Sequence, residues 1–404
     1  MMRLWAFFIA IASFSLAGLS YWSRHIVPTP PAVALIGVEL PLAGNDGATG
    51  VATASAIRLA IEEAQKRAWT GVRVAADVRD GSHHGYANPH TDEGRDDVGE
   101  VKAASTILND FIRSPAQVVA AVGGLTPPVA ATLARDAEKR NLPLLTIAPL
   151  PVRCSASFQS RMYAASIAGN AAREASAAAT FARSRHYRRL AILDDGEPER
   201  RKVADCLGII TLQRERESEI RLPAVRTESG YYHALNTIAL RGVDAFAFVG
   251  PESRGTLLCP ARAAGRVLKP EFLKSTFHRN FDSKALPRNC GWIRRTVHAH
   301  DRRAYAAFVA HYRARYGSKP PPEAAGAYAA TQIAIAAIRG ANGGEAPLRD
   351  KVLRSMRDRS FSTVLGNVRL DSHGEPDWVW FAFDRHTHAQ WFDHREIAVN
   401  AKLK

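Results

Sequence analysis

The stretch VALIGVELPLAGNDGATG (residues 33–50) decides the fold, and it leads into an amphipathic run that ends at Arg67. Its first half is a short apolar run typical of a buried strand. A loop rich in Pro, Gly, Asn and Asp follows, and then a helical pattern begins. A strand, a loop and a helix in this order open an α/β domain, in which ligands bind at the carboxyl ends of the strands. We therefore expect a small ligand near this loop.

The same alternation continues along the chain. Residues 118–122 are apolar and β-branched, as in a buried parallel strand. The loop 123–126 follows, and Pro127 and Pro128 then open a helix, because proline is tolerated in the first helical turn. Residues 142–147 form the next strand. This pattern predicts a mainly parallel sheet with helices on both faces.

A break at residues 148–151 marks a first domain crossing, and a second α/β series comes after it. In this second part we expect strands over 190–193, 245–249, 271–277 and 378–383, and helices over 200–207, 230–240, 255–267, 304–316, 323–339 and 348–356. A strand and a turn are expected over 368–374.

Residues 1–30 read as a targeting segment. Arg3 precedes an uncharged apolar run over 4–22, and a proline-rich spacer follows at 28–31. A positive start with an apolar middle is typical of a signal peptide, but the run also approaches the length of about 20 residues that spans a bilayer. An apolar helix is expected in either case, as a cleaved signal peptide or as a membrane anchor.

The net charge of +15 comes mainly from arginine. This charge is either a compositional bias, or it serves to attract anionic ligands and phospholipid headgroups. Nucleic acid is not an expected partner, because the basic residues are scattered and no aromatic-basic motif occurs.

The cysteines stand at positions 154, 206, 259 and 290. They form disulfides in an oxidising compartment or remain free buried thiols. None shows C-x-x-C spacing, which disfavours zinc.

No motif of an enzyme or of a cofactor site occurs. The glycines between Gly44 and Gly50 lack the dinucleotide-binding spacing, although a loop before a helix offers backbone N–H groups to an anion or polar ligand. The His- and Asp-rich segment 83–97 reads better as a solvated insertion than as a metal site. We expect no cofactor, no metal and no catalysis.

The order of the motifs resembles the periplasmic leucine/isoleucine/valine-binding protein family, the type I substrate-binding proteins of ABC transporters. The segments that carry the resemblance are 36–44, 121–126, 142–149, 322–338, 363–374 and 380–383. Together they extend the resemblance over about residues 31–392.

The resemblance implies an α/β fold of two doubly wound Rossmann-like lobes, joined by three crossovers near 149–154, 291–297 and 363–368. Lobe 1 would comprise 31–150 and 295–365, and lobe 2 would comprise 151–294 and 366–404. A solute would lie between the lobes, which close on it by hinge motion. The protein would be periplasmic or otherwise extracytoplasmic, with anchoring to the inner membrane left open.

The resemblance also implies ligand contacts at the loop ends of the strands. The candidate residues are Asn45, Asp46, Leu125, Thr126, Ala148 and Leu150 in lobe 1, and Glu197, Glu252 and His278 in lobe 2. Thr126 would keep the hydroxyl that takes the carboxylate of an amino acid.

Several family positions differ in this chain. Val152 stands where a threonine is usual, the loop 194–199 lacks the tyrosine that clamps the ligand, and segment 276–278 lacks an acid, for which Glu252 could substitute. A buried ammonium group without a carboxylate costs several kcal/mol. These differences disfavour an ordinary α-amino acid, whereas His278, Arg279 and the positive net charge suit an anionic or neutral solute better.

Two functions follow from these observations. The first is an exported solute-binding protein of a branched-chain-amino-acid-type ABC uptake system, with an ABC permease as its partner. The alternative is a membrane-tethered sensor or assembly module of the same fold, whose amino-acid site has eroded.

Overall fold

The computed structural model describes the backbone of most of the predicted α/β core. The described residues are 33–44, 46–66, 72–82, 96–114, 118–150, 163–168, 171–184, 189–194, 196, 201, 203–209, 218–221, 230, 233, 234, 237, 245–249, 271–275, 290–296, 302–341, 348–357, 359–371, 374–376, 378–385 and 395–400. The expected N-terminal helix and the expected helix over 255–267 lie outside these ranges, as does most of the helix expected over 230–240.

The first sheet is parallel and has the order β2-β1-β3-β4-β5. Its strands are β1 (Val33–Leu40), β2 (Arg73–Asp80), β3 (Val118–Gly123), β4 (Leu144–Thr146) and β5 (Ala164–Ser166). The opening apolar stretch thus forms an inner strand, with Val38 opposite Val78 on one side and Val122 on the other. β1 and β3 are almost entirely buried, as expected for a parallel sheet covered on both faces.

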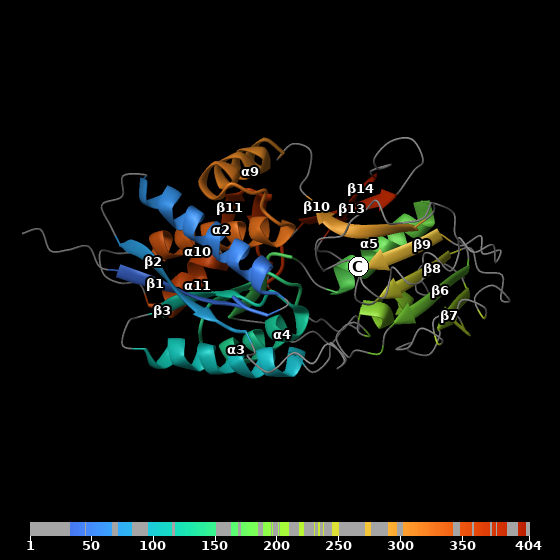
Figure 1. The fold of residues 1–404 in the computed structure, drawn as a ribbon, viewed down its shortest axis with the longest axis horizontal. Helices are drawn as coiled ribbons and strands as arrows, with labels where there is room; N and C mark the ends of the chain where they lie inside the picture. Colours follow the sequence, from blue (N-terminus) through green and yellow to red (C-terminus); the bar gives the residue numbers. More distant parts are fainter. Residues whose placement is uncertain are drawn as a thin grey trace, which may run out of the picture.

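Helices cover both faces of this sheet (Figure 1). One face packs against α2 (Gly47–Lys66), α10 (Pro322–Ala341) and α11 (Arg349–Arg357), and α9 (Arg302–Tyr316) lies outside α2. The other face packs against α3 (Asp96–Arg113) and α4 (Pro127–Arg140). Since α9, α10 and α11 follow β10 in the sequence, the chain returns to the first sheet after β6–β10 of the second sheet, and it adds β13 and β14 to the second sheet afterwards.

The second sheet has the order β14-β13-β10-β9-β8-β6-β7. Its strands are β6 (Arg189–Asp194), β7 (Ser218–Arg221), β8 (Ala245–Val249), β9 (Glu271–Ser275), β10 (Cys290–Thr296), β13 (Trp378–Arg385) and β14 (Arg395–Asn400). β13 and β14 run antiparallel to their neighbours and the other pairs are parallel. α5 (Ala171–Ser184) packs against this sheet.

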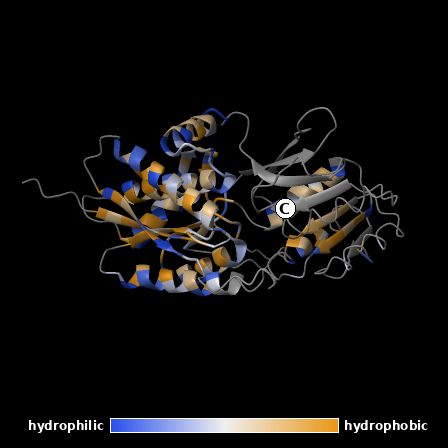
Figure 2. Cartoon of the chain, viewed as in Figure 1, coloured by the Kyte–Doolittle hydropathy of each residue, from blue (hydrophilic) through white to orange (hydrophobic). Residues whose placement is uncertain are grey.

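The two sheets have separate apolar interiors. Figure 2 shows hydrophobic residues gathered on the inner strands and hydrophilic residues on the outer surfaces of the helices. Phe181 of α5 packs with Ile192 of β6 in one core, whereas Ile36 of β1 packs with Ile333 of α10 in another. This arrangement agrees with the two α/β units that the sequence predicts.

The strand pairing and the packing place two segments with the first sheet, although the sequence assigned them wholly or partly to lobe 2. β5 pairs with β4 in the first sheet, although residues from 151 onward were assigned to lobe 2. β11 (Ser360–Thr363) and β12 (Gly366–Arg369) form a hairpin, and Val368 packs in the core of the first sheet although it follows residue 365. Short strands such as Ala164–Ser166 carry no apolar pattern of their own and exist through their pairing. The remaining lobe boundaries stay a prediction.

Cys206 is buried and disulfide-bonded. Of the two states that the sequence leaves open for this residue, the structure has the oxidised one. Within the described ranges, none of the helices combines the length and the apolar character that a membrane span requires.

Candidate functional site

The loops that follow β1, β3 and β4 lie along one edge of the first sheet. These strands are parallel neighbours, so their carboxyl ends share that edge. The Ile147 N–H donates to the carbonyl of Gly123 (2.9 Å), and the Ala148 N–H donates to that of Gly124 (2.9 Å). Five predicted site residues belong to these loops, namely Asp46, Leu125, Thr126, Ala148 and Leu150. The others, Asn45, Glu197, Glu252 and His278, lie outside the described residues.

The loop after β1 is held by the end of β2. The Leu42 N–H donates to Asp80 Oδ1 (2.9 Å), and the Ala43 N–H donates to Ser82 Oγ (2.7 Å). Ser82 is fixed in turn, because its own N–H donates to Asp80 Oδ1 (2.8 Å). The polar side chains after β2 thus fix the backbone of the first site loop.

Asp46 ends this loop and is buried immediately before α2. Its carbonyl accepts the first helical hydrogen bond, from the Gly50 N–H (2.8 Å). A Cβ at position 50 would overlap the backbone carbonyl of Pro41. The glycine therefore allows the first turn of α2 to lie directly against the loop.

The loop after β3 turns sharply at Gly124, whose φ is +67°. A Cβ there would also lie 2.7 Å from Cα of Ala130, so a glycine is needed for both reasons. Thr126 then stands at the N-cap of α4, with an extended backbone and no side-chain capping bond. It is only 5% exposed, and its Oγ1 has no hydrogen-bond partner among the described residues. A buried hydroxyl without a partner is costly, and a bound solute would satisfy it.

The start of α4 is a weak anion site despite its position. Pro127 and Pro128 fill the first two helical positions and lack the N–H groups that a helix start normally presents. The Ala130 N–H already donates to the carbonyl of Thr126 (2.9 Å). The start of α4 therefore offers fewer N–H donors to an anion than a helix start without prolines, and the Thr126 hydroxyl is a further polar group there.

Ala148 and Leu150 are buried among core residues of the first sheet. The carbonyl of Ala148 accepts hydrogen bonds from Thr146 Oγ1 (2.9 Å) and from Ser166 Oγ (3.1 Å). These bonds join the ends of β4 and β5 and fix the loop after β4. The direct ligand contacts predicted for Ala148 and Leu150 stay a prediction.

Glu39 is a buried residue of this edge that the sequence analysis did not identify. It is the penultimate residue of β1, is 3% exposed, and accepts a hydrogen bond from the Gly124 N–H (3.1 Å). Burial is the main cause that raises the pKa of its carboxyl from 4.5 to about 7; the Gly124 N–H lowers the pKa and the Asp80 carboxylate raises it. The sequence does carry one signal for this residue, because Glu39 is a single acidic residue inside an otherwise apolar strand.

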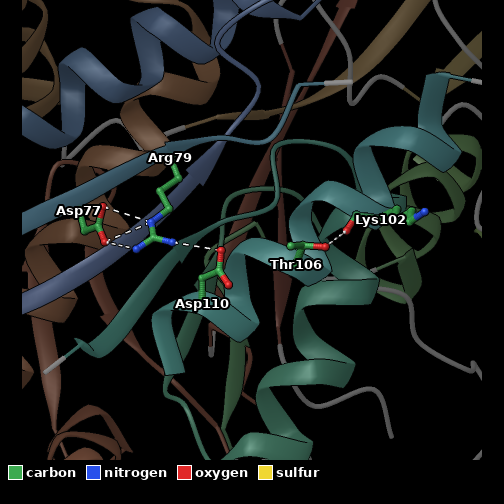
Figure 3. A network of polar contacts seen from close by, with 5 residues as sticks. All are labelled: Asp77, Arg79, Lys102, Thr106 and Asp110. Atoms are coloured by element: carbon green, nitrogen blue, oxygen red, sulfur yellow. Dashed lines mark hydrogen bonds and ion pairs between the residues drawn. The ribbon is translucent and has the colours of Figure 1, made fainter. Parts of the chain in front are cut away.

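A second polar network lies at the outer edge of the sheet, on β2 and α3 (Figure 3). Arg79 pairs with Asp77 (2.9 Å) and with Asp110 (3.3 Å), and its guanidinium lies over the ring of Phe111 (4.9 Å). Such partly exposed pairs contribute little to stability. The network braces α3 against the edge strand.

No group of three or more His, Cys, Asp or Glu residues suited to a metal ion occurs within the described parts of the chain. Most of the His- and Asp-rich segment 83–97 lies outside them.

No family model matches the sequence, and no curated protein matches it. Solved structures do match over most of the chain. A leucine-binding protein from Thermotoga maritima has 19% identity and a TM-score of 0.68, over 92% of this chain and 99% of that chain. An ABC transporter substrate-binding protein from Desulfitobacterium hafniense in complex with Leu has 14% identity and a TM-score of 0.69, over 90% and 100%.

A solute-binding protein of an ABC transporter from R. palustris, in complex with benzoate, has 15% identity and a TM-score of 0.67, over 91% of this chain and 96% of that chain. The protein therefore has the fold of the type I periplasmic binding proteins. This result confirms the predicted fold class.

Proposed function

We propose that the chain is an exported solute-binding protein of a branched-chain-amino-acid-type ABC uptake system, and that it holds a small polar or anionic solute between two lobes. The lobes correspond to the two sheets, with β5, β11 and β12 in the first. The observation that carries the proposal is the buried Thr126 hydroxyl, which has no partner in the described part of the chain and lies at the shared carboxyl edge of the first sheet. The similar structures named for leucine and benzoate support it.

The chemistry of the edge narrows the class of solute. Because Pro127 and Pro128 remove two N–H donors, the group that meets Thr126 in this proposal is a neutral hydrogen-bonding group, in place of the amino-acid carboxylate that the family resemblance implies. His278, which the sequence analysis assigns to lobe 2 as a predicted contact, and its neighbour Arg279 would suit a negative charge elsewhere on the solute. Similar structures named for benzoate and for 3,4-dihydroxybenzoic acid indicate that this fold accepts ligands other than amino acids.

An extracytoplasmic location follows from two independent features. Residues 1–30 have the pattern of an exported chain, and the Cys206 disulfide suits an oxidising compartment. We propose an ABC permease as the partner and no chemical change of the solute. The tethered-sensor alternative requires an eroded site, and the retained Thr126 hydroxyl argues against erosion.

A screen of thermal shifts over amides, aromatic acids, hydroxy acids and amino acids tests the function. A solute at 100 times its Kd stabilises the folded state by about 2.7 kcal/mol. We expect Thr126→Val to weaken the best binder at least about tenfold, which corresponds to the loss of one buried hydrogen bond. Without solute, its free energy of unfolding should stay the same or rise, because the substitution removes a buried hydroxyl that has no partner among the described residues.

Thr146→Val is the matched control, because the buried Thr146 hydroxyl does have a partner, the Ala148 carbonyl two residues further along the chain (2.9 Å). It should destabilise the fold more than Thr126→Val does. The function would be wrong if no solute of the screen shifts the melting temperature, or if Thr126→Val leaves the affinity of the best binder unchanged.

A further inference from the structure

Two connections between the sheets run side by side. After β5 the chain passes from the first sheet to α5, which packs against β9, β10, β13 and β14 of the second. After β12 it passes to β13 of the second sheet. The second connection is hydrogen-bonded to the end of β5, where the first connection begins, because the Ser166 N–H donates to the carbonyl of Gly374 (2.9 Å).

The second connection contains a tight turn that is pressed against β5. The Asp371 N–H donates to the carbonyl of Glu375 (2.8 Å), and the Glu375 N–H donates to Asp371 Oδ1 (3.0 Å). Gly374 has a φ of +74°, and a Cβ there would collide with the backbone of Ala164. The turn is therefore fixed to the first sheet.

Arg173, the third residue of α5, reaches this turn. Its Nε lies 3.4 Å from Glu375 Oε2, and its Nη2 lies 3.8 Å from Asp371 Oδ2. Arg173 is 1% exposed and Glu375 is 5% exposed, so these two charges meet in the interior of the protein, whereas the Asp371 side chain is 25% exposed. We call these three residues the charged clasp.

Separating the charges of the clasp costs free energy. Removing one partner of a buried ion pair strands the opposite charge in the interior, which is strongly destabilising. A cation in the first turn of a helix also faces the positive end of the helix dipole, and the nearby carboxylates of Asp371 and Glu375 offset that repulsion. α5 belongs to the second core through Phe181, and the turn belongs to the first sheet through β5. The two ion pairs of Arg173 therefore connect a helix of the second sheet with a turn fixed to the first sheet. We call this region, where the chain passes between the sheets, the joint.

We propose that the charged clasp, through its ion pairs, holds the joint between the two sheets together and limits how far the sheets turn relative to each other. This inference goes beyond solute binding, because it concerns the chain without a solute and holds whatever the solute is.

Hydrogen exchange of the full chain, followed by mass spectrometry, tests the clasp. In Arg173→Met, which keeps the length of the side chain and removes its charge, peptides that cover 163–168 and 374–376 should exchange at least about tenfold faster. Peptides from β1 and β3 should keep their rates. Small-angle scattering should show a broader distribution of interatomic distances than in the wild type.

Two further variants complete the test. Arg315→Met removes an exposed cation that pairs with Glu62 (3.5 Å) far along the sequence from the joint, and it should leave these peptides unchanged. The triple variant Arg173→Met, Asp371→Asn, Glu375→Gln removes all three charges of the clasp together, so no charge of the clasp loses its partner within it, and the variant should fold while its joint stays loose.

Wild-type exchange at 163–168 and 374–376 in the triple variant would overturn the clasp, whether or not Arg173→Met alone folds. The same would follow from equal acceleration in Arg315→Met. Neither result bears on solute binding, which the thermal shifts measure separately.

Discussion

Glu39→Gln should remove a loss of stability that the wild-type protein suffers as the pH rises from about 4.5 to 7. The pKa of Glu39 is about 7 in the folded protein, and its ordinary value is 4.5. The folded state therefore binds the proton more tightly than the unfolded chain does. This contribution to stability is complete below pH 4.5 and is lost as the pH rises through 7.

The size of the effect follows from the shift. One pKa unit corresponds to 1.36 kcal/mol, so Glu39 alone should lower the free energy of unfolding by about 3 kcal/mol across this interval. A glutamine side chain at this position would keep an oxygen that accepts the Gly124 N–H bond and would not titrate. The difference in the free energy of unfolding between Glu39→Gln and the wild type should therefore grow by about 3 kcal/mol in favour of the variant.

Urea denaturation at several pH values between 4 and 8 measures this difference. Glu62→Gln, which removes an exposed carboxylate of α2, is the control for losing one negative charge. If the wild type and Glu39→Gln show parallel curves of stability against pH, the Glu39 carboxyl does not titrate as described here.

Gly50→Ala should destabilise the protein by about 3 kcal/mol, at the upper end of what forced overpacking costs. In an open helix the same substitution would stabilise, since alanine is favoured over glycine by up to about 1 kcal/mol. Here the new Cβ would overlap the carbonyl of Pro41, which is backbone and can only yield if the loop after β1 moves. Because that loop forms part of the site, solute affinity should fall as well.

Gly326→Ala is the matched control in α10. A Cβ at that position would lie 3.3 Å from the tip of the Ile167 side chain, which can adjust. We expect the control to be neutral or mildly stabilising in urea denaturation. Equal effects of the two substitutions would mean that α2 does not approach the loop so closely.

The sequence predicts those parts of the fold that carry local signals. β1 and β3 are apolar runs that end in glycine- or proline-rich loops, and the helices that follow them begin near the expected residues. β5, β7 and β14 were not predicted, because short strands with few apolar residues are defined by the strands they pair with. The same holds for β10, which lies inside an expected crossover.

The candidate site could be predicted only in part. Thr126 was found because its loop resembles a known motif, but the missing capping bond that leaves its hydroxyl available is a matter of geometry. Glu39 could not be recognised as buried beneath the loop after β3, since its partner Gly124 is 85 positions away. Arg173 and Glu375 are 202 positions apart, so their ion pair is visible only in the folded chain.

An experimental structure of the full chain with the tightest binder of the screen tests the central claim most directly. The account predicts a solute at the carboxyl edge of the first sheet, with a polar atom within hydrogen-bond distance of Thr126 Oγ1. A solute bound elsewhere, or a Thr126 hydroxyl that is occupied by a group of the protein itself, would contradict it.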